Sequence, residues 1–208
     1  MQPQGDAAET TAETGLRDRK KARTRQAIRA AGLDLYEEQG FERTTVDQIC
    51  RRADVAHRTF FRYYASKESL LFGVGFGEAI LDEFAAAPAE LDLWDAFKHA
   101  VARIDGTLEE PSGTTARRRA LRRRFMDIRT VHEHAVQQID RLVQRTVEIA
   151  AARLGTDPDR DLRPHALGAV LGAMTRRHVV HGVEEEGPMD AWWDAFRQVM
   201  PPGPADGR

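Results

Sequence analysis

The sequence predicts an all-α fold in which a three-helix domain containing a helix-turn-helix precedes a larger helical domain. Three observations support this prediction. Apolar residues recur at helical spacing through most of the chain, and no run alternates apolar and polar residues as a half-buried strand would. Between residues 44 and 67, two short helical patterns are separated by a tight turn. With 208 residues the chain is also long enough to bury a sizeable core.

The first helix is predicted to follow a polar, weakly acidic stretch, residues 1–16, which we expect to be disordered. It should stop at Gly40. It begins with a basic run, residues 17–25, which carries six bases and one acid and includes Lys20 and Lys21. Such a run is either a solvated helix face or an arm that lies near DNA phosphates. We favour the second interpretation because a helix-turn-helix follows.

The first short helix of the helix-turn-helix is predicted to start at Thr44, which we expect to be its N-cap. Asp47 lies in the first turn, where its negative charge is favourable at the positive end of the helix dipole. Its buried face is expected to contain Val46, Ile49 and Cys50. The helix should end near Ala53, and Asp54 is a suitable residue for a left-handed turn.

The second short helix is predicted to run from Ala56 or His57 to about Tyr64. Phe60 and Tyr64 share one face by helical spacing and are expected to be buried. The outward residues are expected to be His57, Arg58, Phe61 and Arg62. Outward residues near the N-terminus of such a helix can reach base edges, where arginine bonds guanine and histidine bonds a purine.

The pattern T-T-V-D-Q-I-x-x-x-A-x-V-A-x-x-T-F-F-R-Y-Y-x-S-K-E-S-L resembles the helix-turn-helix of TetR-type (tetracycline-repressor-like) transcriptional regulators over residues 17–72. The resemblance implies base or phosphate contacts by Thr45, His57, Arg58, Thr59, Tyr63 and Lys67. With the outward residues and the basic arm, the expected DNA-binding set is Thr45, His57, Arg58, Thr59, Phe61, Arg62, Tyr63, Lys67, Lys20 and Lys21.

Three residues depart from the family pattern. Asp54 stands where glycine is usual, Ala56 replaces the usual serine cap, and Phe61 replaces a tyrosine whose hydroxyl would bond a phosphate. We therefore expect fewer capping and phosphate contacts than the family usually makes.

The charge is unevenly distributed along the chain. Residues 17–70 have a formal charge of +5, although the whole chain carries −2. A basic segment on a mildly acidic body suits an electrostatically oriented DNA binder.

Several other classes of function lack support in the sequence. No nucleophile–base pair or phosphate-binding loop is recognisable, so we expect neither an enzyme nor a cofactor. The single cysteine, Cys50, cannot form an intramolecular disulfide, which fits a reducing compartment. The spacings of His132 with His134 and of His178 with His181 give no convincing metal site. No apolar run could span a membrane, and we expect a cytoplasmic, nucleoid-associated protein.

The remaining chain is predicted to form helices over about 67–87, 91–108, 121–155 (as one helix or two), 164–182 and 189–200, with a loop over 106–115. Within it, the segment RRRALRRRF, residues 117–125, is rich in arginine. Helical geometry there places Leu121, Phe125 and Ile128 together in one apolar stripe. Four arginines fall roughly opposite this stripe and should face water, namely Arg118, Arg119, Arg122 and Arg123.

The two arginines that flank the apolar stripe could instead point inward and bind an anionic effector, such as an acyl thioester or a carboxylate. The expected ligand-binding set is Trp94, Phe97, Arg117, Arg124, Phe125 and Ile128. The alternative is that these arginines lie along apolar surface or form salt bridges.

The last two helices are predicted to form a dimer interface, as the resemblance to TetR-type proteins also implies. Two glycines on one helix allow close approach, and aromatic residues on the next supply apolar anchors. The expected residues are Gly168, Gly172, Trp192, Trp193 and Phe196; the alternative is ordinary core packing.

The sequence thus predicts a homodimeric repressor that binds a pseudo-palindromic operator in double-stranded DNA and is released by a small-molecule effector. The expected boundaries are a tail over 1–16, a DNA-binding domain over 17–65, a helical regulatory and dimerisation domain over 66–202, and a tail over 203–208. The alternatives are a regulator of the same fold that activates or has no effector and, more remotely, an enzyme with a DNA-like module.

Overall fold

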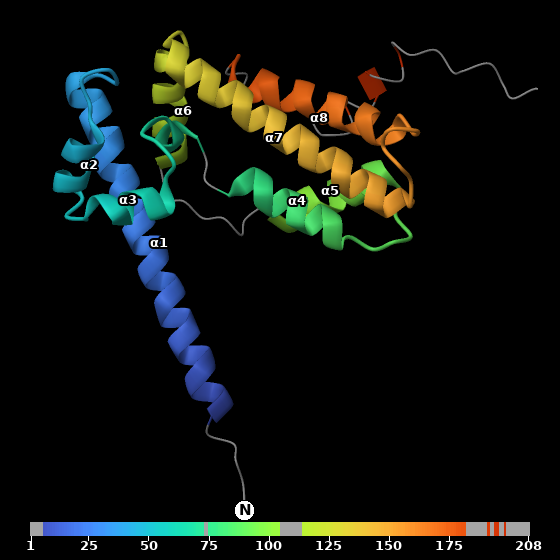
Figure 1. Cartoon of the computed structure of the whole chain (residues 1–208), viewed down its shortest axis with the longest axis horizontal. Helices are drawn as coiled ribbons and strands as arrows, with labels where there is room; N and C mark the ends of the chain where they lie inside the picture. Colours follow the sequence, from blue (N-terminus) through green and yellow to red (C-terminus); the bar gives the residue numbers. More distant parts are fainter. Residues whose placement is uncertain are drawn as a thin grey trace, which may run out of the picture. The chain divides into compact units, whose positions relative to one another are not determined.

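The computed structural model describes residues 6–72, 75–104 and 114–181, and positions 191, 194, 195 and 198; of residues 6–16 it describes the backbone. Every regular element in this part of the chain is helical, as the sequence predicts (Figure 1). The chain divides into two compact units. Unit 1 comprises Met1–Val74 and Pro111–Val131, and unit 2 comprises Gly75–Glu110 and His132–Arg208.

Unit 1 contains the helix-turn-helix and one helix from the middle of the chain. Its elements are α1 (Asp6–Gln39), α2 (Val46–Arg52), α3 (His57–Tyr63), the short 3-10 helix η1 (Glu68–Leu71) and α6 (Thr114–Phe125). Helix α2 packs against α1, and α3 packs against α2 (Figure 1). Helix α6 also belongs to this unit, and the domain boundary expected at residue 65 stays a prediction.

Helix α1 is longer than the sequence predicts. The expected disorder over residues 1–16 is wrong for residues 6–16, because the helix already begins at Asp6. The C-terminal end of α1 agrees with the prediction, since Gly40 follows it with a φ of 86°. Glycine adopts this left-handed conformation without the steric cost that other residues carry. Gly40 therefore turns the chain away from α1 and back towards the core of unit 1.

The expected single helix over residues 67–87 is interrupted. The structure has η1, and then α4 (Phe76–Ala86) begins after Gly75, which has a φ of 85°. The cause is the cluster of glycines in this segment, because glycine loses more backbone freedom in a helix than other residues do. Apolar spacing alone did not show this break.

Unit 2 is built from α4, α5 (Leu93–Ile104), most of α7 (Arg129–Leu154) and α8 (Arg163–Val179). Its core contains Leu81, Phe84, Ala87, Trp94, Ala96, Phe97, Ala100, Ala150, Leu167, Leu171 and Met174. Arg153 donates to the carbonyls of Ala87 and Pro88, each at 2.7 Å, and so satisfies backbone groups at the C-terminal end of α4. Gly155, with a φ of 63°, follows α7 as the sequence predicts.

The long apolar pattern expected over residues 121–155 forms two helices, α6 and α7, which was one of the two alternatives. The turn between them contains Met126 and Ile128, whose amides bond the carbonyls of Arg123 and Phe125. The loop expected over residues 106–115 lies mostly outside the described residues. No described helix is long and apolar enough to cross a membrane.

Candidate nucleic-acid interface

Helix α2 begins one residue later than the sequence predicts. The N-cap is Thr45, whose hydroxyl accepts from the Gln48 amide at 3.3 Å, while the Gln48 side chain accepts from the Thr45 amide at 2.8 Å. This reciprocal capping box satisfies two backbone donors at the helix start. The expected cap, Thr44, is instead fully buried, and its hydroxyl donates to the Gly40 carbonyl at 2.8 Å. Two adjacent threonines made either assignment plausible, but Gln48 fits the capping-box pattern better than Asp47.

The turn between α2 and α3 has the geometry that the sequence predicts. Ala53 is the C-cap of α2, and Asp54 follows with a φ of 52°. Asp54 is the sole non-glycine residue with a positive φ in the described part of the chain. The Val55 amide then donates to the Cys50 carbonyl at 3.0 Å, which closes the turn. These contacts fix the direction in which α3 leaves α2.

Helix α3 is held by buried aromatic side chains. Phe60 is completely buried, and the Tyr64 hydroxyl donates to the Arg25 carbonyl of α1 at 3.0 Å. Burial raises the pKa of the Tyr64 hydroxyl, so it remains a proton donor. As expected from Ala56, no side chain caps the start of this helix. The orientation of α3 therefore depends on its buried face.

The opposite face of α3 is exposed, and it contains the outward residues that the sequence predicts. They are His57, Arg58, Phe61 and Arg62. Thr59 and Tyr63 are half-buried at its edges, and the Arg62 guanidinium lies 5.0 Å from the centre of the Tyr63 ring. Within the described part of the chain, Arg58 has no hydrogen-bond or ion-pair partner. Its donors are thus available to an external acceptor, as base recognition requires.

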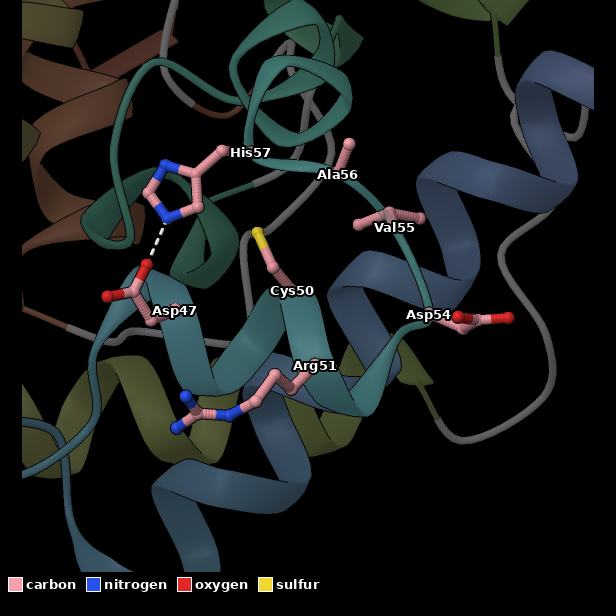
Figure 2. Close-up of a pocket in the computed structure, with 7 residues that line it drawn as sticks. All are labelled: Asp47, Cys50, Arg51, Asp54, Val55, Ala56 and His57. Carbon is pink, nitrogen blue, oxygen red and sulfur yellow. Dashed lines mark hydrogen bonds and ion pairs between the residues drawn. The ribbon is translucent and has the colours of Figure 1, made fainter.

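His57 makes a side-chain contact that sequence patterns did not reveal. Its Nε2 faces the Oδ1 atom of Asp47 in the first turn of α2, and Figure 2 shows this contact. The pair borders a hollow of about 520 Å³ between α2 and the start of α3. The hollow is lined by Asp47, Cys50, Arg51, Asp54, Val55, Ala56 and His57. Helical spacing describes single helices, so it could not place Asp47 opposite His57.

Lys67 has a structural role in addition to the expected contact with DNA. Its ammonium donates to the carbonyls of Phe41 at 2.9 Å and Thr44 at 2.8 Å, and it lies 4.4 Å from the centre of the Phe41 ring. Partial burial lowers the pKa of the Lys67 ammonium. The Tyr36 hydroxyl of α1 donates to the Lys67 carbonyl at 2.7 Å. The residue therefore ties the loop before α2 to η1 and keeps part of its donor capacity.

The basic run of the first helix lies on the N-terminal half of α1. Its exposed members are Arg17, Arg19, Lys20, Lys21 and Arg23. Because α1 continues as a helix through this run, the charges lie along a helix and not along an extended arm. The C-terminal half of the same helix carries buried residues such as Ile28 and Leu33.

The capped α2, the left-handed turn and the exposed α3 define a helix-turn-helix DNA-binding protein. Residues 28–74 match the model of the bacterial regulatory proteins of the tetR family. The chain is 35% identical over 169 residues to the HTH-type transcriptional regulator TcmR of Streptomyces glaucescens, which covers 78% of this chain and 74% of TcmR. It is also 42% identical over 55 residues to the uncharacterized HTH-type transcriptional regulator YxbF of Bacillus subtilis (strain 168), covering 26% of this chain and 14% of YxbF.

The chain therefore belongs to the TetR family. It is a DNA-binding transcriptional regulator, as its similarity to regulators of this kind shows, and it is not an enzyme. Among the described residues, no three histidine, cysteine, aspartate or glutamate side chains are grouped so that they could hold a metal ion.

The expected effector-binding role of Arg117 finds no support in its contacts. Its Nη2 donates to Asp34 Oδ1 and to Glu37 Oε2, both at 2.7 Å, and its Nε donates to Glu37 Oε1 at 2.8 Å. This pairing lowers the pKa of the Glu37 carboxyl and raises that of the Arg117 guanidinium. Arg117 thus joins α6 to α1 as a salt-bridged arginine, the alternative weighed from the sequence. The other candidate, Arg124, is exposed, with its guanidinium 5.4 Å from the centre of the Phe125 ring.

The prediction that Arg118 and Arg122 face water is wrong. Their exposed fractions are 8% and 5%, whereas Arg123 is exposed. Burial, together with neighbouring arginines, lowers the pKa of each buried guanidinium to about 10. The Arg122 guanidinium lies 5.9 Å from the centre of the Phe72 ring. The buried face of α6 therefore contains arginines beside its apolar residues.

The other expected effector-binding residues belong to different units. Trp94 and Phe97 pack in the core of unit 2. Phe125 packs in unit 1, with its ring centre 6.2 Å from that of Tyr36 and 5.9 Å from that of Phe41. Ile128 is half-buried in the turn after α6. The effector-binding role of these residues stays a prediction.

The glycines expected at the dimer interface approach another helix of the same chain. A Cβ atom on Gly172 would lie 2.8 Å from Cγ2 of Val143 in α7, and one on Gly168 would lie 3.0 Å from Cγ2 of Val147. These glycines allow α8 to pack closely on α7, which is the core-packing alternative. Trp192, Trp193 and Phe196 lie outside the described residues. The dimer interface therefore stays a prediction.

Proposed function

We propose that this regulator is a homodimeric repressor whose two α3 helices bind the half-sites of a pseudo-palindromic operator. The observation that carries the proposal is the division of α3 into two faces. Phe60 fixes the helix from its buried side, and Arg58 offers five donors on the exposed side without a partner among the described residues. Side chains with this arrangement can bond base edges in the major groove.

Two copies are needed because seven helical residues contact few bases. A dimer with two-fold symmetry would place its recognition helices about one turn of DNA apart, or a multiple of that distance, on matching half-sites. Phosphate contacts from the basic half of α1, including Lys20 and Lys21, would add affinity that does not depend on sequence. We infer that the protein acts in this way on nucleoid DNA in the cytoplasm.

We further propose that a small-molecule effector releases the protein from DNA by changing the spacing of the two recognition helices. Linkage then requires DNA to weaken effector binding by the same factor. Arg117 is salt-bridged to two carboxylates of α1, so binding of an anionic effector by this residue would require it to leave Asp34 and Glu37.

The direct test is to select the sequences that this chain binds from random DNA and then to map its footprint on the enriched sequences. The expected footprint contains two inverted half-sites, and gel filtration should show two protein chains on each DNA. A single unsymmetrical footprint, or no enrichment of any sequence, would contradict the proposal. Transcription from a promoter carrying the selected site then decides between repression and activation.

A deletion tests the role of the basic half of α1. Removing residues 1–22 deletes four of the bases, Arg17, Arg19, Lys20 and Lys21. Each phosphate contact contributes about 0.9 to the slope of log affinity against log salt concentration. We expect weaker binding and a shallower slope, measured by fluorescence anisotropy at several salt concentrations. An unchanged affinity and slope would exclude these residues from the interface.

A further inference from the structure

A hydrogen-bonding contact between His57 and Asp47 joins the first residue of the recognition helix to the first turn of α2. Both side chains remain more than half exposed, at 54% for His57 and 66% for Asp47. The ring of Phe61, one turn further along α3, lies 5.7 Å from the imidazole ring, measured between ring centres. His57 is thus held on two sides while it faces outward at the end of α3 that usually approaches base edges.

The contact with Asp47 determines what the other nitrogen of His57 can do. An ionised carboxylate only accepts hydrogen bonds, so a neutral imidazole bonded to it must carry its proton on Nε2. Its Nδ1 then has a lone pair and can only accept. In Figure 2 this second nitrogen points away from Asp47, and no described residue bonds to it.

Each base pair presents one exocyclic amino group in the major groove, either N6 of adenine or N4 of cytosine. The other major-groove hydrogen-bonding groups, N7 and O6 of guanine, N7 of adenine and O4 of thymine, are acceptors and cannot bond an accepting nitrogen. Without Asp47, the imidazole could turn and offer either a donor or an acceptor.

We propose that Asp47 is a positioning residue that fixes His57 as a hydrogen-bond acceptor, through Nδ1, for the exocyclic amino group of one base in the operator. This inference rests on the proposed function, because it requires α3 to lie in the major groove. It adds a specificity role for a residue of α2 that does not itself touch the base. Asp47 acts through the ring that it orients.

The experiment begins with selection from random DNA by wild-type protein and by His57→Ala, at about pH 8 where free imidazole is neutral. The base pair whose preference disappears in His57→Ala is the one that His57 contacts. A second operator is then made in which that pair lacks its exocyclic amino group, with purine in place of adenine or pyrimidin-2-one in place of cytosine. The measured quantity is the ratio of affinities for the natural and the amino-free operator.

For wild-type protein we expect the natural operator to bind about tenfold more tightly, in line with the usual cost of one altered base pair. In His57→Ala the ratio should fall below about threefold. Asp47→Ala should lower the ratio towards that value, because the freed imidazole no longer presents a fixed acceptor. Asp47→Lys also cannot accept a hydrogen bond at residue 47, so it is a second test of whether the ratio of affinities falls. Asp47→Glu should restore most of the ratio, because its carboxylate can still reach the imidazole.

Glu42→Ala is the matched control, since it removes an exposed carboxylate just before α2 without touching His57. Its ratio should equal that of wild-type protein, and the use of a ratio cancels any uniform gain in affinity from the lost negative charge. In the double variant Asp47→Ala/His57→Ala, the Asp47 substitution should have no further effect on the ratio. That result would show that Asp47 acts through His57.

Two results would overturn the inference and leave the proposed function intact. One is a wild-type protein that binds the amino-free operator as tightly as the natural one. The other is an Asp47→Ala protein that keeps the wild-type ratio. If wild-type protein enriches no sequence at all, the proposed function fails, and the inference fails with it.

Discussion

Helices α2 and α3 each contain seven residues, yet they are stabilised in different ways. Helix α2 has a capping box made by Thr45 and Gln48, an acid in its first turn and bases in its last turn. Helix α3 has no side-chain cap and no acid in its first turn. It is held instead by Phe60 and Tyr64, which are buried in unit 1.

This difference shows how a short helix can be both rigid and available to a ligand. A helix of seven residues is not stable alone in water, so each of the two needs help from outside the backbone. In α2 the polar side chains at the ends stabilise the helix itself. In α3 the stabilising contacts lie on the buried face, which leaves side chains such as Arg58 and Arg62 exposed on the opposite face.

The largest expected effect comes from removing the main buried anchor of α3. Phe60→Ala should destabilise unit 1 by about 3–5 kcal/mol, because a completely buried ring is lost and a cavity remains. DNA binding should be lost with it. Urea unfolding, followed by circular dichroism, measures the change.

The neighbouring Phe61 is the matched control for this substitution, because it is 52% exposed. Phe61→Ala should change the unfolding free energy by no more than about 0.5 kcal/mol. Any loss of DNA affinity in this variant would then report contact with DNA and not unfolding. Equal destabilisation by the two substitutions would contradict the division of α3 into a buried and an exposed face.

A smaller effect is expected from removing the cap of α2. Thr45→Ala should cost about 1 kcal/mol of stability, since the Gln48 amide loses its side-chain acceptor. Thr45→Ser keeps a hydroxyl at the same place and should retain most of the stability. If alanine and serine behaved alike in thermal unfolding, the capping box would contribute nothing measurable.

The smallest expected effect is a gain in stability from adding a cap to α3. The backbone of Ala56 already has the extended geometry of an N-cap, with φ −72° and ψ 152°. Ala56→Ser should therefore stabilise α3 by about 0.5–1 kcal/mol, because a hydroxyl could accept from an amide of the first turn. A serine variant with unchanged or lower thermal stability would show that the missing cap does not limit α3.

The positions where helices end or the chain turns could be predicted from single residues. Gly40, Asp54 and Gly155 were expected to end helices or to turn the chain, and all three have positive φ angles. The start of α2 was misplaced by one residue because Thr44 and Thr45 are both good caps. The decisive evidence was the pairing of Thr45 with Gln48, which the sequence contains as a threonine–glutamine spacing.

The faces of α6 were misassigned for a physical reason. The predicted apolar stripe included Ile128, but α6 ends at Phe125, so Ile128 does not share its face. The buried positions are Arg118, Leu121, Arg122 and Phe125, which follow the usual spacing of one helix face. The arginines were assigned to the water-facing side from their angular distance to a stripe that included Ile128, so the misplaced stripe also misplaced Arg118 and Arg122.

Contacts between elements were beyond the reach of the sequence. The pairing of Asp47 with His57 and that of Arg117 with Asp34 each join two different helices. Periodicity places residues on faces, but it does not show which faces meet. The exposed face of α3 was predictable because it depends on one helix, whereas an effector site depends on several.

The central claim is that the exposed face of α3 reads DNA sequence while the basic half of α1 adds affinity without sequence preference. The most direct measurement compares Arg58→Ala with the double variant Lys20→Ala/Lys21→Ala on the selected operator and on random DNA at one salt concentration. Arg58→Ala should reduce the ratio of specific to random affinity by about tenfold or more, as the loss of a base contact does. The double lysine variant should weaken binding to both DNAs while leaving that ratio unchanged. A folded Arg58→Ala protein with the wild-type ratio would contradict the claim.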